Sequence, residues 1–121
     1  MIAFREAHAA LRPVNFYSSA DVSWWTPAGT TPDATYYDSP DNHAIAWQLT
    51  SIYIAYNGWS GNVSFTLPSP GNGANWYRVT DTCGWAEGPN QVRAPGAEDL
   101  IGGSGYVYDV CGRGLLLLIA K

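Results

Sequence analysis

The sequence predicts an all-β domain, an antiparallel β-sandwich with Greek-key connections, preceded by a short N-terminal helix. Three observations carry this prediction. Apolar residues alternate with polar or small residues along most of the chain after residue 14, which is the period of a strand. Stretches rich in Gly, Pro and Asn separate these runs and indicate turns. The 121 residues include 6 Trp and 8 Tyr, which strands accommodate well.

Residues 2–12 predict the helix. Phe4, Ala7 and Leu11 recur on one helical face, and Pro13 ends the pattern because the residue before a proline is pushed towards extended backbone. An isolated helix of about eleven residues is marginal. We therefore interpret residues 1–13 as the end of a helix whose partners precede it, with an exposed apolar face, and residues 14–121 as the β-domain.

Seven later runs predict strands. Most alternate with a period of two, whereas the last run is apolar at every position and suits a central strand covered on both faces. The predicted strands are residues 22–25, 43–49, 52–57, 63–67, 76–81, 106–110 and 115–119.

The join between the second and third of these runs is unusual. Thr50 and Ser51 are the only residues between them, and a two-residue hairpin normally needs Gly, Asn or Asp there to reach positive φ. Either the strand is continuous here, or a loop present in related proteins is missing between Leu49 and Ile52.

Charge and hydropathy exclude several partners. The net charge is −4 with six scattered basic residues, so we expect neither nucleic acid nor an anionic membrane surface as a partner. No apolar run approaches the roughly 18 residues of a membrane span. No secretory signal is visible, so a secreted protein would have lost its signal or carry it upstream.

The two cysteines, Cys83 and Cys111, leave two interpretations open. They are either free buried thiols or a disulfide, and a disulfide would indicate an oxidising compartment. We expect no metal site and no cofactor, because two Cys and two His at these spacings match no ligand pattern.

We expect no catalytic residue in this chain. His8 and His43 are the only candidate bases for a nucleophilic triad, and both are expected to be structural. A glycosidase needs only two carboxylates at a suitable distance, which sequence spacing cannot exclude. Asp81 follows a strand and is expected to bond a turn. The formal candidates are Asp81, Glu87, Asp99 and Asp109.

Two tryptophans are candidates for carbohydrate binding. Sugar rings stack on exposed aromatic faces, and Trp59 and Trp85 both fall in predicted loops. Packing within strands accounts for most of the other aromatic residues.

Several motifs together resemble bacterial isoamylase-type debranching enzymes of the α-amylase superfamily. Phe4-Arg-Glu-Ala-His-Ala-Ala-Leu-Arg-Pro13 resembles their last barrel helix, although Ala9 stands where the family commonly has Pro. The hairpin at Thr50 looks shortened by several residues. The motifs that resemble their C-terminal domain are residues 55–61, 65–68, 76–85, 94–96, 100–103 and 111–121.

The resemblance implies a parent enzyme that hydrolyses α-1,6 branch points in glycogen or amylopectin by a retaining mechanism. Its catalytic carboxylates lie on a (β/α)8 barrel, and none of the barrel motifs is in this chain. The resemblance implies that this chain is the C-terminal sandwich of such an enzyme, which packs on the barrel. Cys83 and Cys111 also resemble the cysteines of secreted members, which favours the disulfide and a periplasmic or secreted location.

Three functions follow in order of preference. The first is a non-catalytic sandwich whose partner is the parent's own catalytic barrel, which it stabilises. The alternative is an independent carbohydrate-binding module that contacts α-glucan through exposed Trp. A complete small hydrolase is the third.

Overall fold

The computed structural model describes residues 2–83 and 92–121. Two short α-helices and a 3₁₀ helix accompany eight strands within this part of the chain. The helices are α1 (Ile2–Ala7), η1 (Ala9–Leu11) and α2 (Ala34–Asp38). The strands are β1 (Val22–Trp25), β2 (Ala44–Leu49), β3 (Ile52–Asn57), β4 (Val63–Thr66), β5 (Trp76–Asp81), β6 (Asp99–Gly102), β7 (Val107–Val110) and β8 (Gly114–Ala120).

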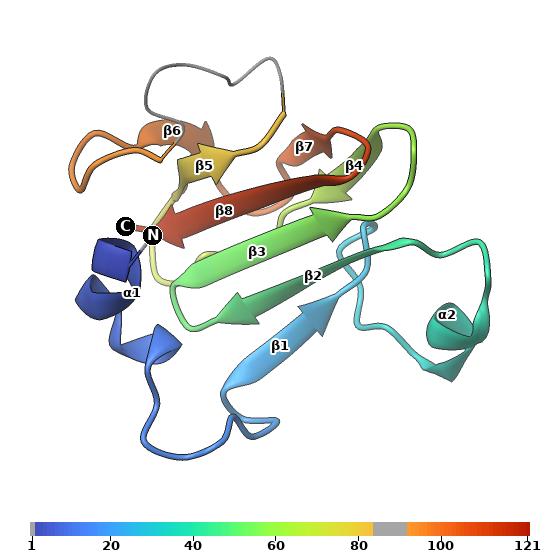
Figure 1. The fold of residues 1–121 in the computed structure, drawn as a ribbon, viewed down its shortest axis with the longest axis horizontal. Coiled ribbons are helices and arrows are strands. Elements are labelled where there is room, and N and C mark those ends of the chain that lie inside the picture. The colour runs from blue at the N-terminus through green and yellow to red at the C-terminus, as the bar shows by residue number, and fades with distance from the viewer. Residues whose placement is uncertain (1, 84–91) are drawn as a thin grey trace.

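The strands form two antiparallel sheets. A six-stranded sheet has the order β1-β2-β3-β8-β5-β6, and β4 and β7 form a two-stranded sheet (Figure 1). The last strand, β8, lies between β3 and β5, so the chain crosses between sheets before closing the larger one. The predicted all-β, antiparallel fold class is confirmed.

The inner face of the large sheet packs against the small sheet. Small residues line this face of β2 and β3: Ala46 pairs with Ala55, and Ala55 pairs in turn with Leu116 of β8. They leave room for large side chains of the opposite layer, including Phe65, which is fully buried in this core. The alternation predicted for β2 therefore holds, with the alanines facing the sandwich core.

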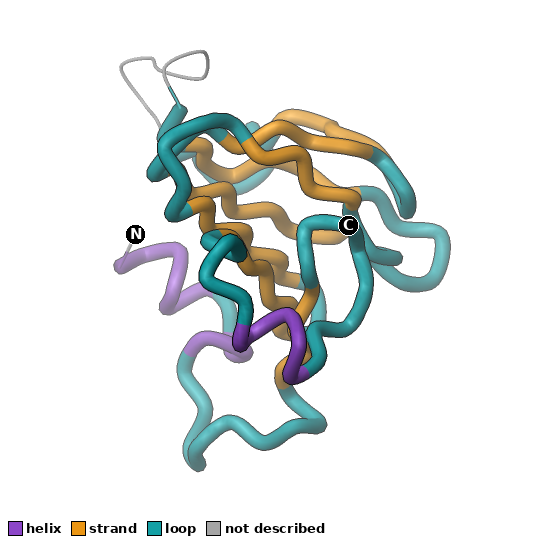
Figure 2. The backbone as a smooth tube through the Cα atoms, turned by 90° about the vertical axis from the view of Figure 1, so that its right-hand side faces the viewer, coloured by secondary structure: helices purple, strands orange, loops and turns teal. Residues whose placement is uncertain are grey.

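The outer face of the large sheet forms a second apolar cluster. Leu117 and Ile119 of β8 belong to it, whereas Leu116 and Leu118 belong to the inner core. Phe4, Ala10 and Leu11 pack against this outer cluster, with the N-terminal helices on one side of the sheet (Figure 2). The prediction that this strand is central and covered on both faces is confirmed.

The N-terminal helix is shorter than the predicted 2–12. It ends at Ala7, because His8 adopts an extended backbone (φ −121°, ψ 103°), and the chain resumes as the 3₁₀ helix η1. The His8 ring stacks on Phe4 with ring centroids 4.1 Å apart, so a side-chain contact bridges the break. No residue of α1 or η1 is buried, and Ile2 is largely exposed, but Phe4 and Leu11 of the predicted apolar face contact the outer cluster, so the expectation of an exposed apolar face is met only in part.

Thr50 and Ser51 form a tight two-residue hairpin. Leu49 pairs with Ile52 across it, so the strand is not continuous, and the first of the two alternatives is wrong. Thr50 reaches the left-handed region at φ 55° without being Gly or Asn. The hairpin closes without further residues.

Cys83 and Cys111 form a disulfide, with their Cα atoms 5.6 Å apart. It ties the end of β5 in the large sheet to the end of β7 in the small sheet. The free-thiol interpretation is therefore wrong.

We predict that replacing both cysteines by alanine lowers the free energy of unfolding by about 3–4 kcal/mol, because the crosslink restricts a loop of 28 residues in the unfolded chain. Urea unfolding of the purified protein measures the change. A reducing agent should shift the wild type towards the variant and leave the variant unchanged. Coincident unfolding curves for the oxidised wild type and the variant would contradict this prediction.

Candidate functional site

Trp59 and His43 form a stacked aromatic pair at one end of the sandwich. Their ring centroids are 4.6 Å apart and their planes are 22° from parallel. His43 directly precedes β2, and Trp59 follows β3 by two residues. Ala44 pairs with Asn57 in the antiparallel register, which brings the two rings together. The Trp59 side of the pair is 47% exposed.

Asn57 fixes the loop that carries Trp59. This asparagine is fully buried, and its amide group donates to the carbonyl oxygens of Gly61 (2.8 Å), Val110 (3.0 Å) and Cys111 (3.1 Å). Its Oδ1 accepts the backbone N–H of Trp59 at 2.9 Å. The fully buried Asn57 side chain therefore joins the loop to the end of β7 and to the disulfide cysteine.

The same loop requires glycine where another segment approaches it. A Cβ at Gly112 would lie 2.2 Å from the carbonyl oxygen of Ser60, so no side chain fits there. The next residue, Arg113, donates its backbone N–H to the carbonyl oxygen of Trp59 at 2.9 Å. On the other side, the N–H of Gly58 donates to the His43 carbonyl at 2.7 Å. The Trp59 backbone is thus held from both sides.

A depression of about 300 Å³ opens beside the pair. Tyr36 forms part of its wall, and its hydroxyl donates to the Ala44 carbonyl. Burial raises the pKa of the Tyr36 phenol above its ordinary value, with a smaller contribution from Tyr37, so the hydroxyl stays a donor. Asn42 donates its side-chain N–H to the Tyr36 carbonyl at 2.8 Å. The exposed residues Asp41 and Asn62 add polar groups to the lining.

The carboxylate of Asp81 is engaged in the structure. It is 1% exposed, and it accepts from the Tyr108 hydroxyl at 2.5 Å and from the Cys83 N–H at 2.9 Å. The prediction that Asp81 bonds a turn is confirmed. Burial, followed by the hydrogen bond to Asp81, raises the pKa of the Tyr108 phenol, and Arg78 opposes that effect.

Asp99 and Asp109 are likewise held by neighbours. The side chains of Arg78 and Arg93 donate to Asp99 at 2.9 and 3.1 Å, and the Arg78 hydrogen bond is the main reason that the pKa of Asp99 is lowered. Asp109 accepts from the Ser64 hydroxyl. Neither carboxylate lines the Trp59 depression.

Three of the residues considered from the sequence are not part of this site. Trp85 and Glu87 lie outside the described residues, and His8 packs on α1, apart from the pair formed by His43 and Trp59. Among the residues that the structure describes, no group of three or more His, Cys, Asp or Glu could hold a metal ion. No helix in that part of the chain is both long and apolar enough to cross a membrane.

A second exposed tryptophan lies on the outer face of the large sheet. Trp24 is 46% exposed and lies beside Trp47, with ring centroids 5.8 Å apart. The strand pattern had assigned Trp24 to packing, and alternation alone could not show that one sheet face is left open. Together with Tyr17 and Val22, the two indoles line a groove of about 460 Å³.

Comparison with known families decides what kind of domain this is. The family model described as "Isoamylase, C-terminal" matches residues 21–119. The chain belongs to this family. As an isoamylase C-terminal domain, it is 52% identical to an isoamylase from a Flavobacterium species and 50% identical to one from Pseudomonas amyloderamosa, in both cases over its whole length. The chain covers only 18% and 17% of these relatives.

The family match agrees with the resemblance that the sequence motifs indicate. The family resemblance is confirmed, and the chain is a small part of the length of its relatives.

We predict that Asn57→Asp destabilises the domain by about 3 kcal/mol or more. A carboxylate still accepts the Trp59 N–H, but it cannot donate to the three backbone carbonyl oxygens that Asn57 binds, and it places a charge on a fully buried side chain. Urea unfolding of the purified protein measures the loss.

Asn62→Asp is the matched control, because Asn62 is exposed and the same change should stay within about 0.5 kcal/mol of the wild type. Equal effects of the two variants would show that Asn57 does not hold the loop.

Proposed function

We propose that this chain is the non-catalytic C-terminal β-domain of a debranching hydrolase that cleaves α-1,6 branch linkages of glycogen or amylopectin, and that it stabilises the catalytic barrel by packing on it. Three findings support the proposal: the family match, the two isoamylases that share half of its residues, and its small share of their length. We infer the identity of the cleaved bond, an α-1,6 branch linkage, from the family resemblance of the sequence motifs.

The outer face of the large sheet is the observation that carries the packing role. One row of side chains crosses four strands through the register pairs Trp24–Trp47, Trp47–Ile54 and Ile54–Leu117. The helices at the N-terminus cover only part of this face, and Trp24 is left half exposed. Exposed apolar surface of this kind marks an interaction site.

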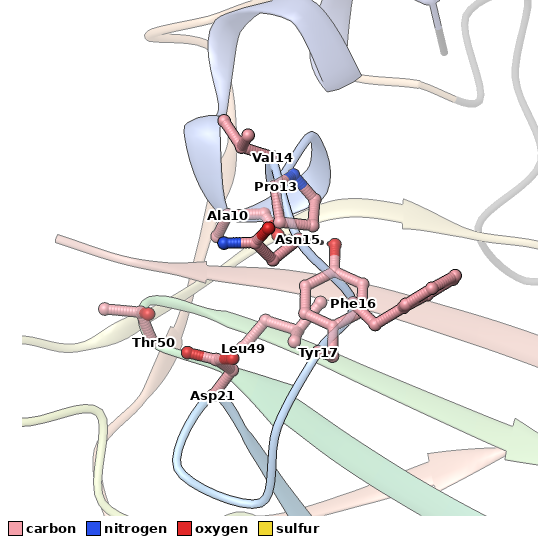
Figure 3. Close-up of a pocket in the computed structure, with 9 residues that line it drawn as sticks. All are labelled: Ala10, Pro13, Val14, Asn15, Phe16, Tyr17, Asp21, Leu49 and Thr50. Atoms are coloured by element: carbon pink, nitrogen blue, oxygen red, sulfur yellow. Dashed lines mark hydrogen bonds between the residues drawn. The ribbon is translucent and has the colours of Figure 1, made fainter.

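The N-terminal segment extends the same surface. Val14 and Phe16 are fully exposed, whereas Tyr17 donates its hydroxyl to the Ala10 carbonyl at 2.6 Å. Figure 3 shows Tyr17 beside Leu49, with Phe16 projecting to the right of the other side chains, around a cavity of about 270 Å³. We infer that residues 1–13 are the last barrel helix, and that the barrel covers Phe16 and Trp24.

The non-catalytic role is supported by the carboxylates. Tyr108 binds Asp81, two arginines bind Asp99, and Ser64 binds Asp109, so each has a structural explanation. We further propose a periplasmic or secreted location, because the disulfide is the kind of crosslink that persists in oxidising compartments.

The non-catalytic role predicts that Asp109→Asn leaves kcat for amylopectin debranching by the intact enzyme within about twofold of the wild type. Asp109 is exposed and binds only the Ser64 hydroxyl among the contacts that the structure gives it. Release of reducing ends measures the rate. A loss of about a hundredfold or more, with an unchanged melting temperature, would assign a catalytic role to this domain.

The packing role predicts that Trp24→Ala lowers the free energy of unfolding of the intact enzyme by about 2 kcal/mol, because a tryptophan buried at an interface contributes about that much. Calorimetry of the intact enzyme measures the shift in melting temperature.

Tyr37→Ala is the control. Tyr37 is 57% exposed on α2, which lies far from α1 in Figure 1, so its removal should change stability by about 0.5 kcal/mol or less. Indistinguishable melting of the two variants would contradict barrel packing at Trp24.

A second candidate function is carbohydrate binding through an exposed tryptophan. The stacked pair of Trp59 and His43 favours it, because the loop is fixed and the indole is half exposed. This surface differs from the one proposed for the barrel, so the two functions are compatible.

A further inference from the structure

We propose that Trp59, His43 and the depression beside them form an α-glucan-binding subsite on this domain, remote from the residues that cleave the glucan. The choice of an α-glucan rests on the proposed function, whereas the presence of a sugar site rests on the geometry of the end of the sandwich.

The aromatic surface suits a pyranose ring. A sugar ring has a face of C–H bonds, which packs favourably on an indole and removes apolar area from water. Trp59 is 47% exposed, and its ring is stacked on His43 at 4.6 Å, which fixes its orientation. Gly61 keeps the edge of the indole open, because a Cβ there would lie 3.5 Å from its Cδ1 atom.

The lining of the depression suits the hydroxyl groups around such a ring. Asp41 supplies a carboxylate that accepts hydrogen bonds, and Asn42 and Asn62 supply amide groups that donate and accept. The volume of about 300 Å³ is at the lower end of small-molecule sites. An aromatic platform with a few polar groups beside it is the composition expected of a sugar subsite.

The site is built before any ligand arrives. Asn57 holds the Trp59 N–H, the Arg113 N–H holds the Trp59 carbonyl, and the lack of a side chain at Gly112 lets the two segments touch. Binding therefore need not order the loop, and that reduces the entropic cost of capturing a weakly held sugar.

The site lies away from the segment that we propose belongs to the barrel. The Trp59 loop follows the end of β3, while α1 lies at the opposite end of the large sheet, beside the start of β3 (Figure 1). A glucan chain held at Trp59 would keep a long, branched substrate near the enzyme without filling the catalytic site.

The test uses the intact enzyme labelled with 5-fluorotryptophan, so that each indole gives its own fluorine NMR signal. Trp59→Phe and Trp24→Phe assign the two signals of interest. Titration with maltoheptaose, an α-1,4-glucan, should shift the Trp59 signal in a saturable manner and leave the Trp24 signal in place. No shift of the Trp59 signal at millimolar maltoheptaose would overturn the subsite.

Cellohexaose, a β-1,4-glucan, tests the ligand class. We expect it to leave the Trp59 signal unchanged. A saturable shift of equal size with both sugars would overturn the assignment to α-glucans.

Matched alanine variants give a second measurement. Trp59→Ala should weaken retention of the intact enzyme in native gels containing amylopectin by about tenfold, because loss of a central tryptophan commonly costs at least that factor. Trp24→Ala removes an indole from the outer sheet face, which we propose lies against the barrel and away from the depression, so it should change retention by less than about twofold. Equal retention of the Trp59→Ala variant and the wild type would contradict the subsite.

The outcome separates this subsite from the proposed function. If the enzyme releases reducing ends from amylopectin but shows no Trp59 shift, the subsite is overturned and the proposed function stands. If the Trp59 signal shifts with maltoheptaose but the enzyme fails to debranch amylopectin, the proposed function is overturned and the sugar site stands.

Discussion

The arrangement of this domain depends on one constraint, which is that strand β8 is apolar towards both faces of the sheet it completes. Leu116 and Leu118 face the core shared with β4 and β7, and Leu117 and Ile119 face the opposite side. A strand of this kind is stable only where both faces are covered. The small sheet covers the inner face, and the N-terminal helices cover part of the outer face. We propose that the catalytic barrel covers the rest of the outer face.

The end of the sandwich has a different organisation, based on buried polar contacts. Asn57 joins the loop after β3 to the end of β7, and the disulfide joins β7 to β5. These bonds are directional, so they fix the positions of backbone segments in a way that apolar packing alone does not. Trp59 is presented on this fixed end, whereas Trp24 lies on the open sheet face. Their different surroundings are the reason that we propose sugar binding for Trp59 and domain packing for Trp24.

The sequence predicted those elements whose pattern is local. Seven strands were visible as period-two or fully apolar runs. Strand β6 was missed because Gly102 at its end reads as a turn and Leu100 is exposed on an edge strand. Helix α2 was missed although Asp33 caps it by accepting the Tyr36 N–H at 2.9 Å. The break at His8 depends on contacts with Phe4, and the periodicity of residues 2–12 gave no sign of it.

The site was predictable in part. Trp59 was chosen because it falls in a loop, but its partner His43 lies sixteen residues earlier and was expected to be structural. Only the register between β2 and β3 brings the two rings together. The exposure of the Trp24 side chain could not be predicted either. Alternation shows that a strand has two faces, but it does not show which face the rest of the protein covers.

The measurement that tests the account most directly is hydroxyl-radical footprinting of the intact enzyme, with oxidation of each tryptophan read by mass spectrometry. Trp24 and Trp59 are exposed to nearly the same extent in this domain, at 46% and 47%. We predict that Trp24 is protected in the intact enzyme while Trp59 is oxidised readily. Equal oxidation of the two residues would show that the outer sheet face is not covered and would contradict the account.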